Sequence, residues 1–378
     1  MWFLQVDTLL AIAAFALALG VLRRLLPQPA VNLLLPVASL GVIGWISPSL
    51  AVFTLVYALG GLLLVWLLRA LPRGKRLCFP LFCLLALAPF LLGRGEAFGL
   101  ALPVPVESVG LAFQMLKLID AFYYVYYSGE PVKLLPYLGY MTYLPTFTSG
   151  PLFRYRDFLR SYEKPLLLDA ELLSSGLRRV ILGLFKKVVL AELALTGLNW
   201  LLEQALRLPV CLAITAASYL VLYLDLSGYS DIAVGLGRIG GLDVPENFKH
   251  PLRAPTLTQF WRSWHATLSD WIREHIYVVV AKKKLNKGVS ALIALATMVV
   301  MSLWHGFNLP YLLAGVYNGV LLALENLLGL TTVNRRKAKK PVLFFRCLAV
   351  NLLFALNTLV FTLPAGQVPA VLRGFVRL

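Results

Sequence analysis

Charged residues are scarce in this 378-residue sequence, at 14% of the chain, whereas hydrophobic residues make up 59%. Soluble domains carry roughly 25% charged and about 45–50% apolar residues. A water-soluble globule could not bury so much apolar surface, so lipid must be the solvent for most of the chain. The composition therefore excludes a soluble protein and indicates a polytopic membrane protein.

Acidic residues are fewer still: 18 Asp and Glu stand against 35 Lys and Arg, giving a formal net charge of +17. The cations occur in short clusters between apolar runs, which is the pattern of positive-inside anchoring to membrane lipids. They are not interleaved with exposed aromatic residues in a soluble domain, so nucleic acid is not an expected partner.

Cysteine and histidine are also rare, with four of each. The cysteines lack C-x-x-C spacing and lie in apolar surroundings, so we expect buried thiols rather than disulfides. No two histidines have zinc-ligand spacing, and we expect no metal site. The sequence GLGRIG at 235–240 spells a dinucleotide fingerprint but follows a membrane span instead of a strand, which argues against that function.

The long apolar runs predict an all-α fold with ten or eleven crossings, since one span needs about 20 apolar residues. Basic clusters at 23–24 and 69–76 place the N-terminus outside. The helix at 106–127 carries Lys117 and Asp120, which we expect to face protein. The predicted spans include residues 3–22, two within 25–68 broken at 47–49, 77–93, 208–224, two within 288–324 hinged near 308–310, and 347–372.

Shorter or more polar segments receive other predictions. Residues 97–105 are short and hold two prolines, so they predict a re-entrant piece, and 134–152 includes a turn at PTFTSGPL. Residues 154–171 predict a loop. Residues 174–193, with Arg178, Arg179, Lys186 and Lys187, and residues 255–281 predict amphipathic helices that lie in the membrane plane.

His305 is the strongest candidate for a catalytic residue, because it interrupts the uncharged stretch 288–324 in MSLWHGFN. Trp304 could exclude water and Gly306 could allow a close approach of substrate or backbone. A buried imidazole there would be neutral near pH 7 and able to accept a proton. The alternative is a histidine that only bridges two helices by hydrogen bonds.

His265 lies in FWRSWHATLSDWIREHIY, where Trp261, Trp264, Leu268 and Trp271 form one stripe if the segment is helical. By itself this pattern favours a plain interfacial anchor. Two carboxylates, Asp225 and Asp231, bracket LSGYSD at the end of a span. They could orient an imidazole, although a structural role in hydrogen bonding is the more common use of such residues.

Four ordered motifs resemble the membrane-bound O-acyltransferase family: LSGYSDIAVGLG at 226–237, VPENFKHP at 244–251, TQFWRSWHATLSDWIREHIY at 258–277 and LWHG at 303–306. The resemblance implies a single membrane-embedded domain over 1–378, with peripheral helices at 1–93, a motif-bearing core at 106–330 and a C-terminal helix at 341–378. It implies catalytic roles for His305 and His265. The supporting or substrate-binding residues would be Trp261, Ser230, Asp231, Asn247, Trp304 and Gly306.

Two bacterial branches of that family compete. PTFTSGP, the modest length and VVVAKKKLNKG after Tyr277 are more like the branch that moves D-alanine to teichoic acid. The alternative is the branch that acetylates exported polysaccharides such as alginate or cellulose. A flippase without acyl-transfer chemistry, or a structural scaffold, would not explain the motifs.

The first branch implies an acyl group that arrives as a thioester on the phosphopantetheine arm of an acidic acyl carrier protein, so no bound cofactor is expected. The acceptor would be a lipid-linked envelope polymer, and the place a bacterial cytoplasmic membrane. His305 would act as general base, and His265 would position the acceptor or stabilise the oxyanion. The basic residues expected to dock the carrier are Lys282, Lys283, Lys284 and Lys287.

Overall fold

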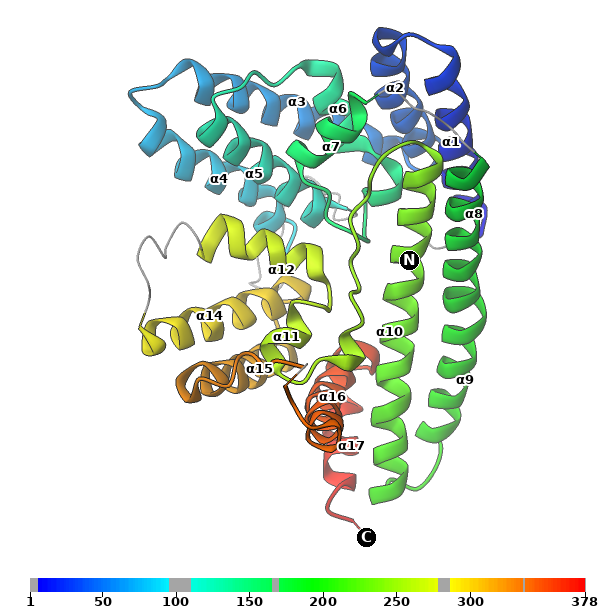
Figure 1. Cartoon of the computed structure of the whole chain (residues 1–378), viewed down its shortest axis with the longest axis vertical. Coiled ribbons are helices and arrows are strands. Elements are labelled where there is room, and N and C mark those ends of the chain that lie inside the picture. The colour runs from blue at the N-terminus through cyan, green and yellow to red at the C-terminus, as the bar shows by residue number, and fades with distance from the viewer. Residues whose placement is uncertain (1–5, 95–109, 165–169, 278–285, 336, 378) are drawn as a thin grey trace. The chain divides into compact units, whose positions relative to one another are not determined.

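A computed structural model describes residues 6–94, 110–164, 170–277, 286–335 and 337–377, and within these ranges every regular element is a helix (Figure 1). The first half contains α1 (Val6–Leu25), α2 (Gln28–Ile46), α3 (Pro48–Ala70), α4 (Lys75–Leu92), α5 (Leu111–Ser128), α6 (Leu134–Thr142), α7 (Tyr155–Tyr162) and α8 (Ala170–Leu184). The second contains the π-helical η4 (Phe185–Leu190), α9 (Ala191–Leu202), α10 (Leu208–Ile239), α11 (Leu257–Trp261), α12 (Ala266–Ile272), the π-helical η6 (Arg273–Tyr277), α14 (Lys287–His305), α15 (Leu309–Leu328), α16 (Lys340–Thr362) and α17 (Val368–Gly374).

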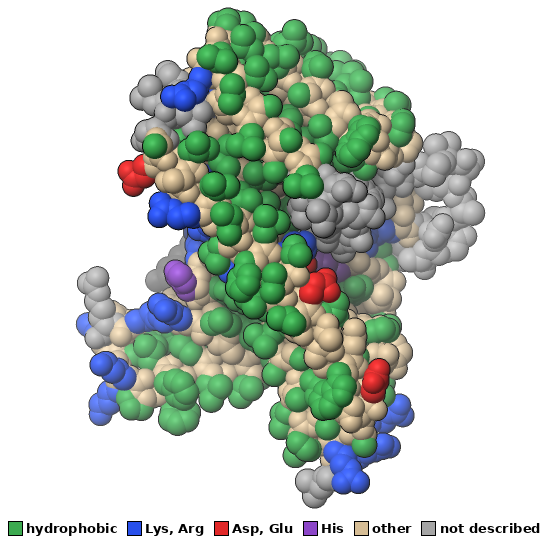
Figure 2. Space-filling model, turned by 90° about the vertical axis from the view of Figure 1, so that its right-hand side faces the viewer, with side chains coloured by type: hydrophobic (Ala, Val, Ile, Leu, Met, Phe, Trp, Pro, Cys, Tyr) green, Lys and Arg blue, Asp and Glu red, His purple; other side chains and the backbone are tan. Residues whose placement is uncertain are grey.

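Seven of the described helices are long and apolar enough to cross a membrane: α2, α3, α4, α10, α14, α15 and α16. Hydrophobic side chains cover much of the face shown in Figure 2, as expected for a surface whose solvent is lipid. The predicted class, an all-α polytopic membrane protein, is confirmed. Ten or eleven crossings were predicted, and the predicted re-entrant piece at 97–105 lies outside the described residues.

Two helix boundaries follow directly from local sequence. Ser47 caps α3, because its side chain accepts a hydrogen bond from the Leu50 amide, and Pro48 occupies the first helical position. Asn308 caps α15 through the Tyr311 amide, again followed by proline in the first turn. Both breaks were predicted and both are confirmed, whereas α16 begins earlier than predicted, at Lys340, and ends at Thr362.

The chain divides into two compact units: residues 1–182 with 231–245, and residues 183–230 with 246–378. The first unit has an aromatic core, in which α7 buries Tyr155, Phe158 and Tyr162 at three- and four-residue spacing. This spacing makes a helix of part of the segment 154–171, which was wrongly predicted to be a loop. The exposed Arg156 and Arg160 made the segment hydrophilic on average, although its other face is buried.

Lys117 and Asp120 face protein in this unit, as predicted. The Lys117 side chain is fully buried, and its Nζ donates hydrogen bonds to the Tyr140 carbonyl (3.1 Å) and to Thr146 Oγ1 (3.3 Å). Asp120 accepts a 2.6 Å hydrogen bond from the Tyr155 amide. Polar partners therefore offset the cost of burying both ionisable groups.

Arg23, which was predicted only to mark the cytoplasmic side of the membrane, also stabilises the fold. The side chain is 8% exposed, and its guanidinium donates to backbone carbonyls of Gly240 (3.0 Å), Gly241 (2.7 Å), Tyr162 (3.0 Å) and Lys164 (3.2 Å). Five donors in a fixed fork suit such a set of carbonyls. One arginine thus holds α1 to the end of α7 and the turn that follows α10.

The helix predicted to lie in the membrane plane at 174–193 is instead packed along a candidate span. In the first unit Arg179 Nε bonds Asp231 Oδ1 of α10 at 2.6 Å. In the second unit Lys187 of η4 pairs with Asp225 of α10, and a Cβ at Gly228 would lie only 3.0 Å from Lys187 Cβ. Two of the four cations, Arg179 and Lys187, thus find carboxylates on α10 rather than lipid headgroups.

A tight helical hairpin, α14 and α15, dominates the second unit. A small-residue motif on α15, Gly315-Val-Tyr-Asn-Gly319, lets the two backbones approach. An added Cβ would stand 2.8 Å from Val299 Cα at Gly315 and 3.0 Å from Leu295 Cα at Gly319. Only glycine allows this packing, which fixes the direction in which α14 presents its C-terminal end.

Candidate active site

The motif segment at 251–277 contains the described part of the amphipathic helix predicted over 255–281, and it is not a single helix. It forms two short helices, α11 and α12, and η6, with a break at 262–265 where His265 adopts the left-handed conformation (φ 48°). The stripe of Trp261, Trp264 and Leu268 is therefore not one continuous face. The prediction failed because bonds from other parts of the second unit, described next, determine where each short helix starts.

The N-terminus of α11 is held by a carboxylate from α15. Glu325 accepts hydrogen bonds from the Leu257 amide (2.7 Å), the Thr258 amide (2.8 Å) and the Thr258 hydroxyl (2.6 Å). Thr256 adds a side-chain cap on the Gln259 amide. A negative charge at a helix N-terminus is favourable, so this contact fixes α11 on the hairpin.

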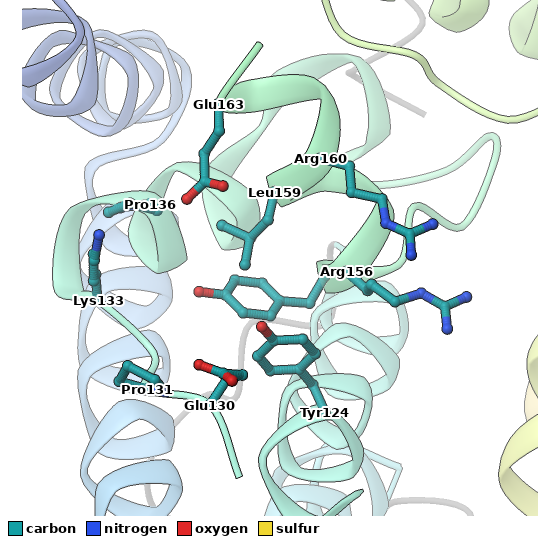
Figure 3. Close-up of a pocket in the computed structure, with 10 residues that line it drawn as sticks. Tyr124, Glu130, Pro131, Lys133, Pro136, Arg156, Leu159, Arg160 and Glu163 are labelled. Atoms are coloured by element: carbon teal, nitrogen blue, oxygen red, sulfur yellow. The ribbon is translucent and has the colours of Figure 1, made fainter. Parts of the chain in front are cut away.

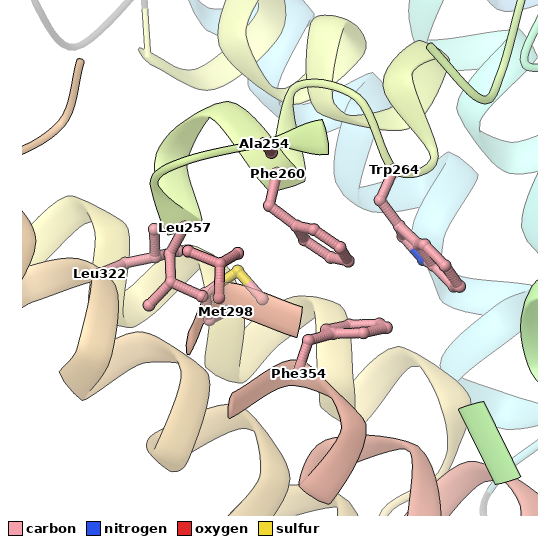
Figure 4. Packing of buried hydrophobic residues seen from close by; sticks show 8 residues of the cluster. Ala254, Leu257, Phe260, Trp264, Met298, Leu322 and Phe354 are labelled. Carbon is pink, nitrogen blue, oxygen red and sulfur yellow. The ribbon is translucent and has the colours of Figure 1, made fainter. Parts of the chain in front are cut away.

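The buried side of the motif segment packs into an apolar cluster (Figure 4). Phe260 and Trp264 stack with ring centroids 5.6 Å apart, and Phe354 of α16 lies 4.4 Å from Phe260 and 4.7 Å from Trp264. These aromatic contacts supply apolar burial and specific geometry together. The full set of buried members is Ala254, Leu257, Phe260, Trp264, Met298, Leu322, Val350 and Phe354.

The start of α12 is held by Asn247, which is 3% exposed. The Asn247 carbonyl accepts from the Ala266 amide at 2.8 Å, and Oδ1 accepts from the Thr267 hydroxyl at 2.8 Å. Asn247 Nδ2 donates to Ser230 Oγ at 3.4 Å. The structure thus brings together two of the predicted supporting residues, Ser230 and Asn247, and bonds Asn247 to the two residues that follow His265.

His265 stands at the N-cap of α12 and is partly buried. Its Nδ1 is buried and has no hydrogen-bond partner among the residues that the structure describes. The pKa of this imidazole is lowered to about 4, mainly by burial and in addition by the charge of His305, while a backbone hydrogen bond opposes both. His265 is therefore neutral near pH 7.

His305 ends α14, and its side chain is exposed. Its ring meets Phe361 of α16 edge-on at 4.9 Å and lies 6.0 Å from Tyr311. The prediction of a buried imidazole is not met, because the uncharged stretch is divided at this point and His305 occupies the end of a helix. Beside it, a Cβ at Gly306 would come within 2.7 Å of the Tyr311 ring.

A cavity of about 240 Å³ lies between the motif helices and the hairpin. Trp261, Ser269 and Thr258 contribute to one side, and Met301 and Asn326 to the other. Trp261 Nε1 is a buried donor without an acceptor in the described part of the chain. Such a donor is costly to leave unpaired, and a substrate oxygen in the cavity could accept from it.

Other predicted site residues have different environments. Asp231 is ion-paired with Arg179 in the first unit, Trp304 is partly buried, and Lys287 is exposed at the start of α14. The predicted docking residues Lys282, Lys283 and Lys284 lie outside the described residues. No group of three or more potential metal ligands occurs in the described ranges.

Sequence reasoning missed two residues that shape the surroundings of the histidines. Glu325, which holds the start of α11, and Phe361, which packs on the His305 ring, lie outside the four motifs, and only tertiary contact reveals them. Tyr311 could have been found, because Asn-Leu-Pro predicts a helix start that returns the chain beside its own hinge. A neutral imidazole and a second, exposed one can together accept a proton and donate a hydrogen bond to an anion.

The profile of the family described as MBOAT, membrane-bound O-acyltransferase, matches residues 111–362. A probable alginate O-acetylase of Pseudomonas syringae is 33% identical over 235 residues, which cover 59% of this chain and 44% of the relative. A teichoic acid D-alanyltransferase of Bacillus subtilis is 29% identical over 208 residues, 52% of this chain and 53% of the relative.

A peptidoglycan O-acetyltransferase of Helicobacter pylori is 27% identical over 195 residues, 50% of this chain and 37% of the relative. The aligned part of the chain spans about half the length, or less, of these curated relatives. The matched range 111–362 includes both motif histidines, Asn247 and Glu325.

Proposed function

Because the chain belongs to the membrane-bound O-acyltransferase family, we propose that it transfers an acyl group from a thioester to hydroxyl groups of a cell-envelope polymer in a bacterial cytoplasmic membrane. The observation that carries the proposal is that both motif histidines, His265 and His305, lie in one compact unit and inside the range that matches the family. The first is held beside Asn247, and the second lies at the end of the hairpin.

In this mechanism the acceptor hydroxyl loses its proton to His305 as its oxygen attacks the thioester carbonyl. The tetrahedral intermediate carries an oxyanion, toward which a neutral His265 can donate a hydrogen bond. Collapse of the intermediate breaks the carbon–sulfur bond, and the thiolate leaves and takes up a proton. His305 is exposed and bordered by aromatic rings, an environment that suits a base that must meet a bulky acceptor.

The cavity beside Trp261 supplies a candidate place for part of the donor. Polar groups from Thr258 and Ser269 line it together with apolar side chains from α14. Mixed linings of this type orient a ligand while they exclude water.

Two acyl groups have specific support. The features around PTFTSGP and after Tyr277 favour D-alanyl, carried by an acidic, phosphopantetheine-bearing protein. The 33% identity to a probable alginate O-acetylase favours acetyl.

To test acyl transfer, the purified protein in proteoliposomes is given each thioester and a hydroxyl acceptor, and the newly formed ester is measured by mass spectrometry. Transport of the acyl group without any ester would contradict acyl transfer and favour a flippase.

For the carrier, we propose docking at the basic cluster of Lys282, Lys283 and Lys284. Complementary charge speeds encounter and is screened by salt, with a Debye length of about 8 Å at physiological ionic strength. Reversing the three lysines to glutamate would weaken carrier binding in neutral detergent, whereas the matched triple reversal of Lys337, Lys339 and Lys340 would not. Unchanged affinity in the first variant would make the cluster a lipid anchor.

A further inference from the structure

The first unit contains a surface cavity of about 470 Å³ that the proposed acyl transfer does not use. It lies where α5 ends, and the start of α6 and one face of α7 complete it. Its volume is in the usual range for small-ligand pockets, about 300–1,000 Å³. Figure 3 shows Tyr124, Glu130, Lys133 and Glu163 around one space, which Arg156 and Arg160 also line with their guanidinium ends turned outward.

Two carboxylates face the tyrosines of this cavity. Glu130 and Glu163 both act electrostatically on Tyr124, and Glu163 acts also on Tyr155. Neither carboxylate has an ion-pair partner in the described ranges, whereas Asp157, outside the cavity, lies 3.6 Å from Arg156 Nε. The two tyrosine rings meet edge to face with centroids 5.1 Å apart.

Carboxylates next to aromatic rings are the usual receptors of an ammonium group, which gains charge pairing and cation–π contact together. The C-terminal end of α5 at Ser128 adds the negative end of a helix dipole. On another side stands Lys133, the N-cap of α6, where no side-chain hydrogen bond caps the helix. A lysine at a helix N-terminus suits a phosphate.

The cavity is tied to the end of a membrane span. Trp66 Nε1 of α3 donates to the Val132 carbonyl at 2.9 Å, and Arg69 Nε donates to the Gly129 carbonyl at 3.3 Å. Both acceptors lie in the loop that carries Glu130. Tryptophan and arginine at the end of a span mark the headgroup level of a bilayer, so the cavity opens where lipid headgroups are.

We propose that this cavity binds a zwitterionic phospholipid headgroup, with its primary ammonium between Glu130, Glu163 and the two tyrosines and its phosphate at Lys133. This site is separate from the motif histidines and does not rest on the proposed acyl transfer. Phosphatidylethanolamine has this chemistry, and phosphatidylglycerol has the same phosphate without the ammonium.

The test uses the full chain, delipidated in neutral detergent, and measures lipid binding by native mass spectrometry and by the rise in unfolding temperature. We expect phosphatidylethanolamine to bind roughly tenfold more tightly than phosphatidylglycerol, since the ammonium contacts are lost in the latter. Glu130→Gln with Glu163→Gln would abolish this preference. Glu171→Gln, an exposed glutamate on α8 outside the cavity, is the matched control and would keep it.

Lys133→Gln separates the two halves of the site, because it would weaken both lipids equally and leave their ratio unchanged. Equal affinity of the wild-type protein for the two lipids would overturn the proposal, as would an unchanged preference in the double glutamine variant. Soluble phosphoethanolamine distinguishes the source of the ligand. Binding of the soluble compound as tight as that of the lipid would overturn the assignment to a membrane lipid.

Discussion

The hairpin α14–α15 and the motif segment at 251–277 each carry one of the two histidines, but different interactions shape them. The hairpin is long, apolar and closed by Gly315 and Gly319, so its form follows from composition and small-residue spacing. The motif segment is short and broken, and it depends on Glu325 and Asn247. The comparison indicates that His305 is placed by a stable scaffold, whereas His265 is placed by a network of polar contacts.

The largest expected effect is on His305. We expect His305→Ala to lower transfer by about 10²–10⁴-fold, the range of a lost general base, with an unchanged unfolding temperature because the side chain is exposed at a helix end. Initial rates of ester formation and thermal unfolding in detergent measure the two quantities. Activity within about tenfold of the wild type would defeat the general-base assignment.

His265 should show a smaller loss of activity and a clearer loss of stability. Asparagine tolerates the left-handed conformation better than alanine does. We therefore expect His265→Asn to reduce transfer but keep the unfolding temperature, and His265→Ala to lower both. The measurements are ester formation and thermal unfolding of each variant.

His250→Asn is a matched control for that pair, because His250 is also left-handed (φ 57°) and is exposed. It should leave transfer unchanged. A His265→Asn variant less active than His305→Ala would mean that the two catalytic roles must be exchanged.

The same comparison shows which features of the fold and of the site can be predicted from sequence. Span length and helix breaks depend on local composition and capping, so the breaks at Ser47 and Asn308 and the class of fold were predictable. The break before His265 depends on carboxylate and amide partners far away in sequence, and periodicity alone wrongly gave a continuous helix. His305 was found from its isolation in an apolar run, but that isolation says nothing about exposure.

The location of two basic residues was also predicted incorrectly from local sequence. Arg179 and Lys187 were expected at the membrane surface, but α10 carries a carboxylate for each. A cation cannot reveal from local sequence whether a headgroup or an aspartate will pair with it. Glycines offered the better signal, since Gly228 directly faces Lys187.

The hairpin itself can be weakened without touching either histidine. Gly319→Ala would place a Cβ within 3.0 Å of Leu295 Cα, and overpacking of this kind costs about 1–3 kcal/mol. We expect a lower unfolding temperature, measured by thermal unfolding, and reduced transfer because the end of α14 moves.

Gly197→Ala in α9 is the control for this variant, since nothing lies within 4 Å of its added Cβ. Alanine is the better helix former there, so stability should stay or rise by up to about 1 kcal/mol. Equal destabilisation by the two substitutions would contradict close packing at Gly319.

The smallest expected effect is a pH dependence of stability that belongs to His265. Its pKa is lowered from 6.5 to about 4 by burial and by His305, so between these values the unfolded chain binds a proton that the folded chain does not. The free energy of unfolding is therefore unaffected by His265 above pH 6.5. It decreases as the pH falls toward 4, by at most about 1.4 kcal/mol for each pH unit. Chemical unfolding of the wild type and of His265→Asn between pH 7.5 and 4.5 measures it. The asparagine variant should show a shallower decline, because it has no imidazole to protonate, whereas His250→Asn should keep the wild-type slope. Parallel curves for all three proteins would mean that the imidazole is hydrated in the folded state and that the polar network around Asn247 does not exclude water from it.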